Sequence, residues 1–449
     1  MCLALVGENA GVDERWLTAA RGGDRDTVLD LLRALPAVVV AGQGGSLLLQ
    51  AAAYARQTEV VALLVEHGAD AARPWADGTD PVTWAADHGS YEVLQALLAS
   101  SKEPFRQDSP QHRALAAARP WLTVDPEREL RGRLGIGRHG EARVERELVG
   151  GIDFQPTATL LRVTTPDGRC AEVELAHRAV VTFLERAVGQ RPSRHDLVAR
   201  ALHFGEPGSC DWSESLDAMT ARLDLAPTYT WAAGAIEDPS TDLRRFAADV
   251  LHAMSFEDRP FRARALELLR RRLRAEGDPA ALDSALGAFA GYSRAEADLA
   301  DIVQHARHPA AEVRLRVALL GSVGNPQYGR RFAPPPEVPV ALVELTYDPE
   351  GLVRAGALFT LAEGGMDEPH VRAAMADRLH DEDDEARLQA AAGLALLGDP
   401  RGSDVFGQIA GTVEAGTPAA LRVDEVSRRL AHGGPAALLR AATARVPRR

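Results

Sequence analysis

The sequence predicts a mainly α-helical protein in which two tandem α-solenoids flank a small α+β segment containing a β-hairpin. Three observations lead to this fold class. Several residue columns recur every 33 positions in the first hundred residues, and an acid followed six residues later by arginine recurs in the C-terminal half. Aromatic residues make up only 5% of the chain, while alanine and leucine are abundant, which favours helices over sheet.

The first register occupies about residues 12–100. Each unit is expected to be a pair of short helices, too short to be stable alone, and stacking buries a shared core. Small alanine pairs let the first helices approach closely, and the Val/Leu columns fill the space between units. The recurring positions are Ala19-Ala20, Ala52-Ala53 and Ala85-Ala86; Val28, Val61 and Leu94; Leu31, Leu64 and Leu97; and Asp26, Glu59 and Glu92.

The stretches QTEVVALLVEHGAD (57–70) and DGTDPVTWAADHGSYEVLQALL (77–98) resemble ankyrin repeats. The resemblance covers about three units, and residues 1–100 are expected to form this domain. It implies a concave surface beside the alanine pairs, which would include Tyr54, Trp84 and His88, with Trp75 on a connecting finger. Exposed aromatic side chains dominate binding energy on such surfaces. Packing of Tyr54 and Trp84 against the neighbouring repeat is the alternative.

The second register occupies about residues 225–449. Each arginine begins an apolar helix, and an Asp or Pro at the preceding turn suits a helix start. His308-Pro309 keeps the spacing without the acid, and Asp278-Pro279 departs, with Ser284 in place of arginine. The pairs are Asp238 with Arg244, Asp348 with Arg354, and Asp381 with Arg387, and Arg314 follows His308.

These units resemble HEAT repeats, particularly the short variety of phycobilin lyases and bacterial HEAT-repeat proteins. The resemblance implies a structural ladder in which Arg244, Arg314, Arg354 and Arg387 join successive units through Asp238, Asp348, Asp381 or backbone carbonyls. A guanidinium has five donors and can satisfy several acceptors at a crowded turn. Because His308 replaces the acid, we expect Arg314→Ala to be better tolerated than Arg354→Ala.

The middle of the chain is expected to hold a linker at 101–125 and an α+β segment at 126–224. Residues 104–125 are rich in Pro, Gln and Ser, which is typical of a linker. Two apolar runs flank Pro166-Asp167-Gly168 and predict a β-hairpin near 158–175.

Six arginines crowd into residues 128–146, among them Arg131, Arg133 and Arg138. They predict either a solvated face balanced by nearby glutamates or a contact for an anionic partner. We expect Arg133→Ala to leave the melting temperature unchanged.

Charge and composition exclude several function classes. The net charge is −13, with acidic ends, so nucleic acid is an unlikely partner, since phosphate neutralisation supplies most of that affinity. The only lysine is Lys102, which argues against Schiff-base and phosphate-loop chemistry. The three cysteines are too few and scattered for a disulfide framework, and neither a signal peptide nor a membrane span is predicted. A cytoplasmic location is expected.

Three motif-like patterns are better explained without a ligand, so no metal and no cofactor is expected. Gly135–Gly140 fits GxGxxG, but arginine-rich residues precede it in place of a buried strand. Asp381–Glu385 is typical of a solvated acidic helix start. The spacing of a possible zinc set is too long and irregular; its members are Cys170, His177, His195, His203 and Cys210.

The expected function is that of a non-enzymatic protein-binding scaffold or adaptor, because solenoids present long surfaces of variable side chains. Another protein, of unknown identity, is the expected partner. Two alternatives come from other classes: a chaperone-like lyase or modification factor of the phycobilin-lyase type, and a nucleic-acid-binding HEAT protein, which the acidic charge disfavours.

Overall fold

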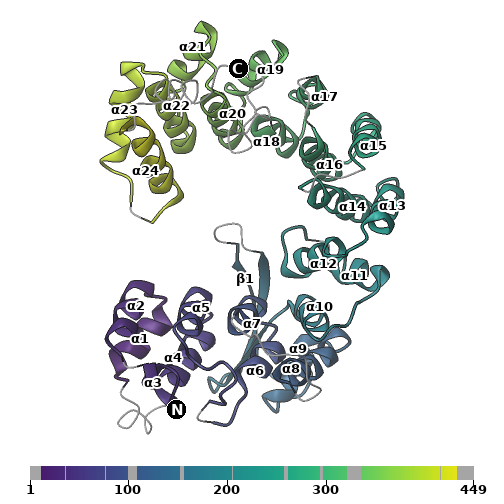
Figure 1. Ribbon diagram of the computed structural model, residues 1–449, viewed down its shortest axis with the longest axis vertical. Helices are drawn as coiled ribbons and strands as arrows, with labels where there is room; N and C mark the ends of the chain where they lie inside the picture. The colour runs from purple at the N-terminus through teal and green to yellow at the C-terminus, as the bar shows by residue number, and fades with distance from the viewer. Residues whose placement is uncertain are drawn as a thin grey trace, which may run out of the picture. The chain divides into compact units, whose positions relative to one another are not determined.

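Helices dominate the computed structural model of this chain, and a three-stranded antiparallel sheet lies in its middle (Figure 1). The elements group into two compact units, Met1–Leu223 and Asp224–Arg449. The structure describes residues 12–35, 37–75, 77–99, 109–151, 156–204, 206–256, 261–293, 297–320, 335–414 and 416–431. Lys102 lies outside these ranges.

Unit 1 begins with three helix pairs that follow the 33-residue period. Asp13 and Asp24 cap the two helices of the first pair, and Asp80 caps the first helix of the third pair. Each aspartate side chain accepts a hydrogen bond from a backbone N–H. The pairs are α1 (Glu14–Gly22) with α2 (Arg25–Ala34), α4 (Gln43–Tyr54) with α5 (Thr58–Glu66), and α6 (Pro81–Asp87) with α7 (Tyr91–Leu98); the short α3 (Ala37–Val40) precedes α4.

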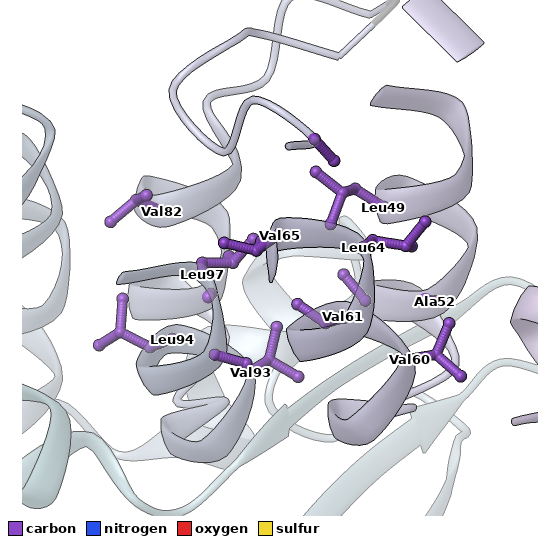
Figure 2. Close-up of a cluster of buried hydrophobic side chains, with 14 of the residues drawn as sticks. Leu49, Ala52, Val60, Val61, Leu64, Val65, Val82, Val93, Leu94 and Leu97 are labelled. Atoms are coloured by element: carbon purple, nitrogen blue, oxygen red, sulfur yellow. The ribbon is translucent and has the colours of Figure 1, made fainter. Parts of the chain in front are cut away.

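The recurring columns form the core of this array. Val28, Val61 and Leu94 are at most 1% exposed, and each alanine pair is buried. Figure 2 shows Val61 and Val65 of α5 and Val93 and Leu97 of α7 gathered between these two helices, which pack on each other. Burying one such side chain contributes about 1.5–3 kcal/mol, so the array is held together by contacts between units.

Six helical segments complete unit 1, and they correct the linker prediction. The expected linker at 101–125 contains α8, because Ser109 caps it, Pro110 suits its first turn and an alanine-rich run continues it. Helix α8 packs against α6 and α10. The segments are α8 (Pro110–Ala118), the 3-10 helix η1 (Arg119–Leu122), α9 (Pro126–Arg133), α10 (His177–Ala187), α11 (Arg194–Ala201) and α12 (Cys210–Thr220).

The sheet has the order β1-β2-β3, with β1 (Arg143–Gly150), β2 (Thr157–Thr164) and β3 (Cys170–Glu174) all antiparallel. The hairpin formed by β2 and β3 was predicted. Strand β1 was not, because its sequence RVERELVG carries charges at successive positions and lacks an apolar face. Its position at the edge of the sheet explains the pattern, since charged side chains are typical of edge strands.

The two faces of the sheet are covered differently. Leu161, Val163 and Val173 pack with Trp121 and Leu130, on the side of η1 and α9. Ala158, on the opposite face, belongs to the core that continues into the ankyrin-like helices. The sheet therefore lies between helices of unit 1 on both sides.

Unit 2 is a succession of antiparallel helix pairs. The second helices of the pairs, α14, α16, α18, α20 and α22, each pack on the next, and α23 and α24 pack on α22. This is HEAT-like packing. The helices are α13 (Ala226–Ala235), α14 (Thr241–Met254), α15 (Arg262–Ala275), α16 (Pro279–Tyr292), α17 (Asp298–Val303), α18 (Ala311–Leu320), α19 (Glu337–Leu345), α20 (Gly351–Glu363), α21 (Pro369–Asp377), α22 (Asp384–Leu396), α23 (Pro400–Ala410) and α24 (Pro418–Ala431).

Candidate protein-binding site

Four predicted contact residues form one aromatic cluster on the array. The ring centroid of Tyr54 lies 5.1 Å from Trp75 and 4.9 Å from Trp84, and the two tryptophans are 5.5 Å apart. His88 stacks on Trp84 at 4.5 Å. Tyr54 ends α4, whereas Trp84 lies in α6 and His88 follows it, so two successive repeats build the cluster.

The members of the cluster differ in exposure. Tyr54 is 40% exposed, Trp84 and His88 are half-buried, and Trp75 is only 3% exposed. Trp75 therefore lies beneath the cluster and supports it, which differs from the exposed anchor expected from the sequence. The physical reason is that its ring packs against the rings of both Tyr54 and Trp84. Tyr54 presents the largest exposed fraction of the four.

Polar groups beside Tyr54 complete the cluster. The Gln50 amide lies 3.5 Å from both the Tyr54 hydroxyl and the Asp77 carboxylate. Burial raises the pKa of Tyr54, so its hydroxyl stays protonated at neutral pH. The backbone N–H of Thr79 lowers the pKa of Asp77, so that carboxylate stays charged. The site thus combines an aromatic surface with a hydroxyl donor and a carboxylate acceptor, as protein interfaces commonly do.

The arginine-rich segment is largely occupied by internal bonds. Arg133 donates two hydrogen bonds of 2.8 Å to Asp87, and its guanidinium lies 4.8 Å from the centre of the Trp121 ring. Arg131 donates to Glu127 and to the carbonyl of Gly140 at 3.0 and 2.9 Å. Arg133 thus ties α9 to α6, and these contacts support a stabilising role in place of the neutral one expected from the sequence. Arg138 is exposed.

In the candidate ladder, Arg314 and Arg354 make the same set of bonds. Arg354 donates to the carbonyls of Asp348 and Pro349 in its own turn at 2.9 and 3.0 Å, and to Asp381 of the next unit at 2.6 and 3.0 Å. Arg314 donates to the carbonyls at 308 and 309 and to Asp348 at 2.6 and 2.9 Å. Each arginine joins its own turn to the acid of the following unit.

The Arg354–Asp381 pair is deeply buried, with side chains 6% and 1% exposed. Burial opposes the charge of Asp381, but the hydrogen bonds from Arg354 outweigh it and lower the pKa of that carboxyl. Because Asp348 supplies the acid for Arg314, the absence of an acid at His308 does not weaken the bonds of Arg314. The expected tolerance of Arg314→Ala therefore loses its basis.

The two ends of the ladder differ from its middle. Arg244 donates to the carbonyls of Asp238 and Pro239, each at 2.9 Å, and to Glu276 at 2.9 and 3.0 Å. Arg387 donates to the carbonyl of Asp381 at 2.6 Å and to the carboxylate of Asp384 within its own helix start.

Glu276 shows how the unit near Asp278-Pro279 aligns with the other HEAT-like units. Its carboxylate accepts the backbone N–H two residues on, as Asp348 and Asp381 do in their turns. Six residues after Glu276 stands Leu282, so the register lies two residues before the expected Asp278. The next unit has His308 at the acid position. No arginine–acid bond of the ladder type therefore joins these two units, because Leu282 stands at the arginine position and His308 at the acid position.

Sequence reasoning missed Arg56, which holds the array to the sheet. Arg56 has φ 57°, the one positive φ among the described residues other than glycine. Gly23 and Gly89 occupy the same place one period away, with φ 72° and 65°. Its side chain pairs with Glu172 and, at 3.1 Å, with Glu174. The sequence signal for this role was the arginine at position 56, since glycine stands 33 residues before it and 33 residues after it.

The remaining motifs stand apart from any assembled site. Gly135–Gly140 follows α9 rather than a strand, so it lacks the context of a dinucleotide-binding turn. Cys170 is exposed and Cys210 is buried. Within the described ranges, no group of three or more His, Cys, Asp or Glu side chains could hold a metal ion. In the same ranges, no helix has both the length and the apolar character needed to cross a bilayer.

Residues 16–108 match the family described as Ankyrin repeats (3 copies). This stretch is therefore an ankyrin-repeat array. Among solved structures, the X-ray structure of YibA from Escherichia coli is similar over 53% of this chain and 93% of its own, with 15% identity and a TM-score of 0.39. The crystal structure of an engineered protein is similar over 96% of this chain and 98% of its own, with 13% identity and a TM-score of 0.37. No curated protein matches the sequence.

Proposed function

We propose that this chain is a non-enzymatic scaffold that binds another protein through its ankyrin array, with Tyr54, Trp84 and His88 in the contact. The observation that carries the proposal is the aromatic cluster shared by two successive repeats, in which Tyr54 is 40% exposed over the buried Trp75. A rigid, half-exposed aromatic group beside polar groups is the composition of an interface hot spot.

The HEAT-like unit supports the same class of function, because a solenoid offers a second extended surface for a partner. Arg138, exposed near the end of α9, is a further candidate contact for an anionic group. A substrate whose turnover by the purified chain is abolished by a single His or Cys substitution would contradict the non-enzymatic part of the proposal.

Tyr54→Ala tests the binding surface. We expect affinity capture from the native host to recover a protein with the wild-type chain and to lose it with Tyr54→Ala, because the aromatic anchor is removed. Tyr347→Ala is the matched control, since Tyr347 is 49% exposed in the other unit. Equal recovery by both variants, with unchanged circular dichroism, would place the contact elsewhere.

A further inference from the structure

A cavity of about 410 Å³ lies within unit 1, away from the aromatic cluster's rings. Its walls come from the α4–α5 turn, α5 and α7, and from the sheet face opposite to α9. Its floor is apolar: Val60, Val93, Leu160 and Cys210 are each at most 3% exposed. The volume falls in the range of small-ligand sites, about 300–1,000 Å³.

The charges around this cavity do not balance. Its lining carries two arginines, Arg56 and Arg162, against four glutamates, a formal charge of −2; the glutamates are Glu59, Glu92, Glu147 and Glu174. Both arginines are already engaged, since Arg162 donates to Glu172 at 2.7 Å and Arg56 pairs with Glu172 and Glu174. Arg56 thus holds the array to the sheet, and Arg162 joins two strands within the sheet.

Three lining carboxylates remain without a cation. Glu59, Glu92 and Glu147 make no ion pair with any residue that the structure describes. The Oε1 atom of Glu92 is buried and finds no hydrogen-bond donor within those residues, and burial raises the pKa of this carboxyl. A buried acceptor without a donor is destabilising, and a ligand carrying N–H groups would satisfy it.

We infer that this cavity receives a lysine or arginine side chain presented by a partner protein. The cationic end supplies N–H donors and positive charge to Glu92, Glu59 and Glu147, and the aliphatic stem covers the apolar floor. The inference rests on the proposed protein-binding function for the source of the side chain. It uses a different set of residues from the aromatic cluster.

Ligand-observed NMR on the full chain tests the inference with Nα-acetyl-lysine amide as the probe. Nα-acetyl-norleucine amide has a similar stem without the ammonium group, and we expect it to bind about tenfold more weakly or not at all. Glu92→Gln keeps the shape and removes the charge, and should weaken lysine-amide binding about tenfold. Glu66→Gln is the matched control, because Glu66 is exposed at the end of α5 and outside the cavity.

If Glu92→Gln fails to fold, Glu147→Gln on the edge strand tests the same prediction. Equal binding of the two amides, or unchanged lysine-amide binding in the folded glutamate variants, overturns the inference. Binding of cadaverine without binding of the lysine amide overturns it as well, because the ligand is then a free diamine. If Tyr54→Ala loses the partner and the lysine amide does not bind, the inference about this cavity is wrong and the proposed scaffold function is still supported.

Discussion

At the scale of single residues, Arg56 occupies a left-handed backbone position that the neighbouring repeats give to Gly23 and Gly89. The left-handed region costs an L-residue roughly 1–2 kcal/mol, which glycine avoids. Its ion pairs with Glu172 and Glu174 connect residues 116 and 118 positions apart in the sequence. The half-buried ion pairs offset part of the cost of the conformation that the repeat turn requires.

Arg56→Ala and Arg56→Gly separate backbone strain from ion pairing. Both variants lose the pairs with Glu172 and Glu174, but only glycine relieves the left-handed backbone. We expect urea unfolding to show Arg56→Ala less stable than Arg56→Gly by about 1 kcal/mol. Equal stability of the two variants would mean that the positive φ at this position is not retained in solution.

At the scale of elements, the bonds between HEAT-like units decide how firmly neighbouring helix pairs are joined. Arg314 and Arg354 each connect the carbonyls of one turn to the acid of the next. Arg314 thus joins the unit of α18 to that of α20, and Arg354 joins the unit of α20 to that of α22. The link at Leu282 and His308 is absent. The helices α16 and α18 still pack on each other, held by apolar side chains and the Arg316–Asp283 pair at 2.7 and 2.8 Å.

Arg354→Ala should lower the melting temperature, because it leaves the buried Asp381 with only the longer contact of 3.4 Å to Arg378. Breaking a buried pair in this way costs roughly 3–5 kcal/mol. Arg307→Ala is the matched control: Arg307 also makes two bonds to one carboxylate, Glu344, but its side chain is 82% exposed and its loss should change little. Equal melting temperatures for the wild type and Arg354→Ala would remove the ladder as a stabilising feature.

At the scale of the whole molecule, the chain consists of two units whose contacts are concentrated within each of them. The ion pair of Arg133 with Asp87 belongs to Met1–Leu223, and that of Arg354 with Asp381 belongs to Asp224–Arg449. Local stability is expected to follow this division, since opening proceeds in cooperative units.

Hydrogen-exchange mass spectrometry of two variants tests that division. Arg133→Ala should speed exchange in α6 and α9 and cost about 1–3 kcal/mol, while α20 and α22 stay protected. Arg354→Ala should produce the opposite pattern. Arg138→Ala controls for the loss of an arginine near α9, because Arg138 is exposed. Faster exchange throughout the chain in either variant would show that the two units unfold together.

The sequence by itself determined the repeat architecture and named the four side chains that the structure brings into contact. The 33-residue period is visible in the sequence because each unit presents the same small and apolar side chains to equivalent neighbouring units. Val28, Val61 and Leu94 are an example. The hairpin of β2 and β3 was equally local, since a glycine-containing turn joins two apolar runs.

Only the tertiary structure decided the burial of Trp75, the existence of β1, the place of Glu276 in the ladder and the pairing of Arg56. Each depends on a partner that is distant in the sequence: the rings of two repeats for Trp75, the strand β2 for β1, Arg244 for Glu276, and the glutamates of β3 for Arg56. Local patterns record which side chains a segment presents, whereas exposure and charge pairing are properties of the contacts made after folding.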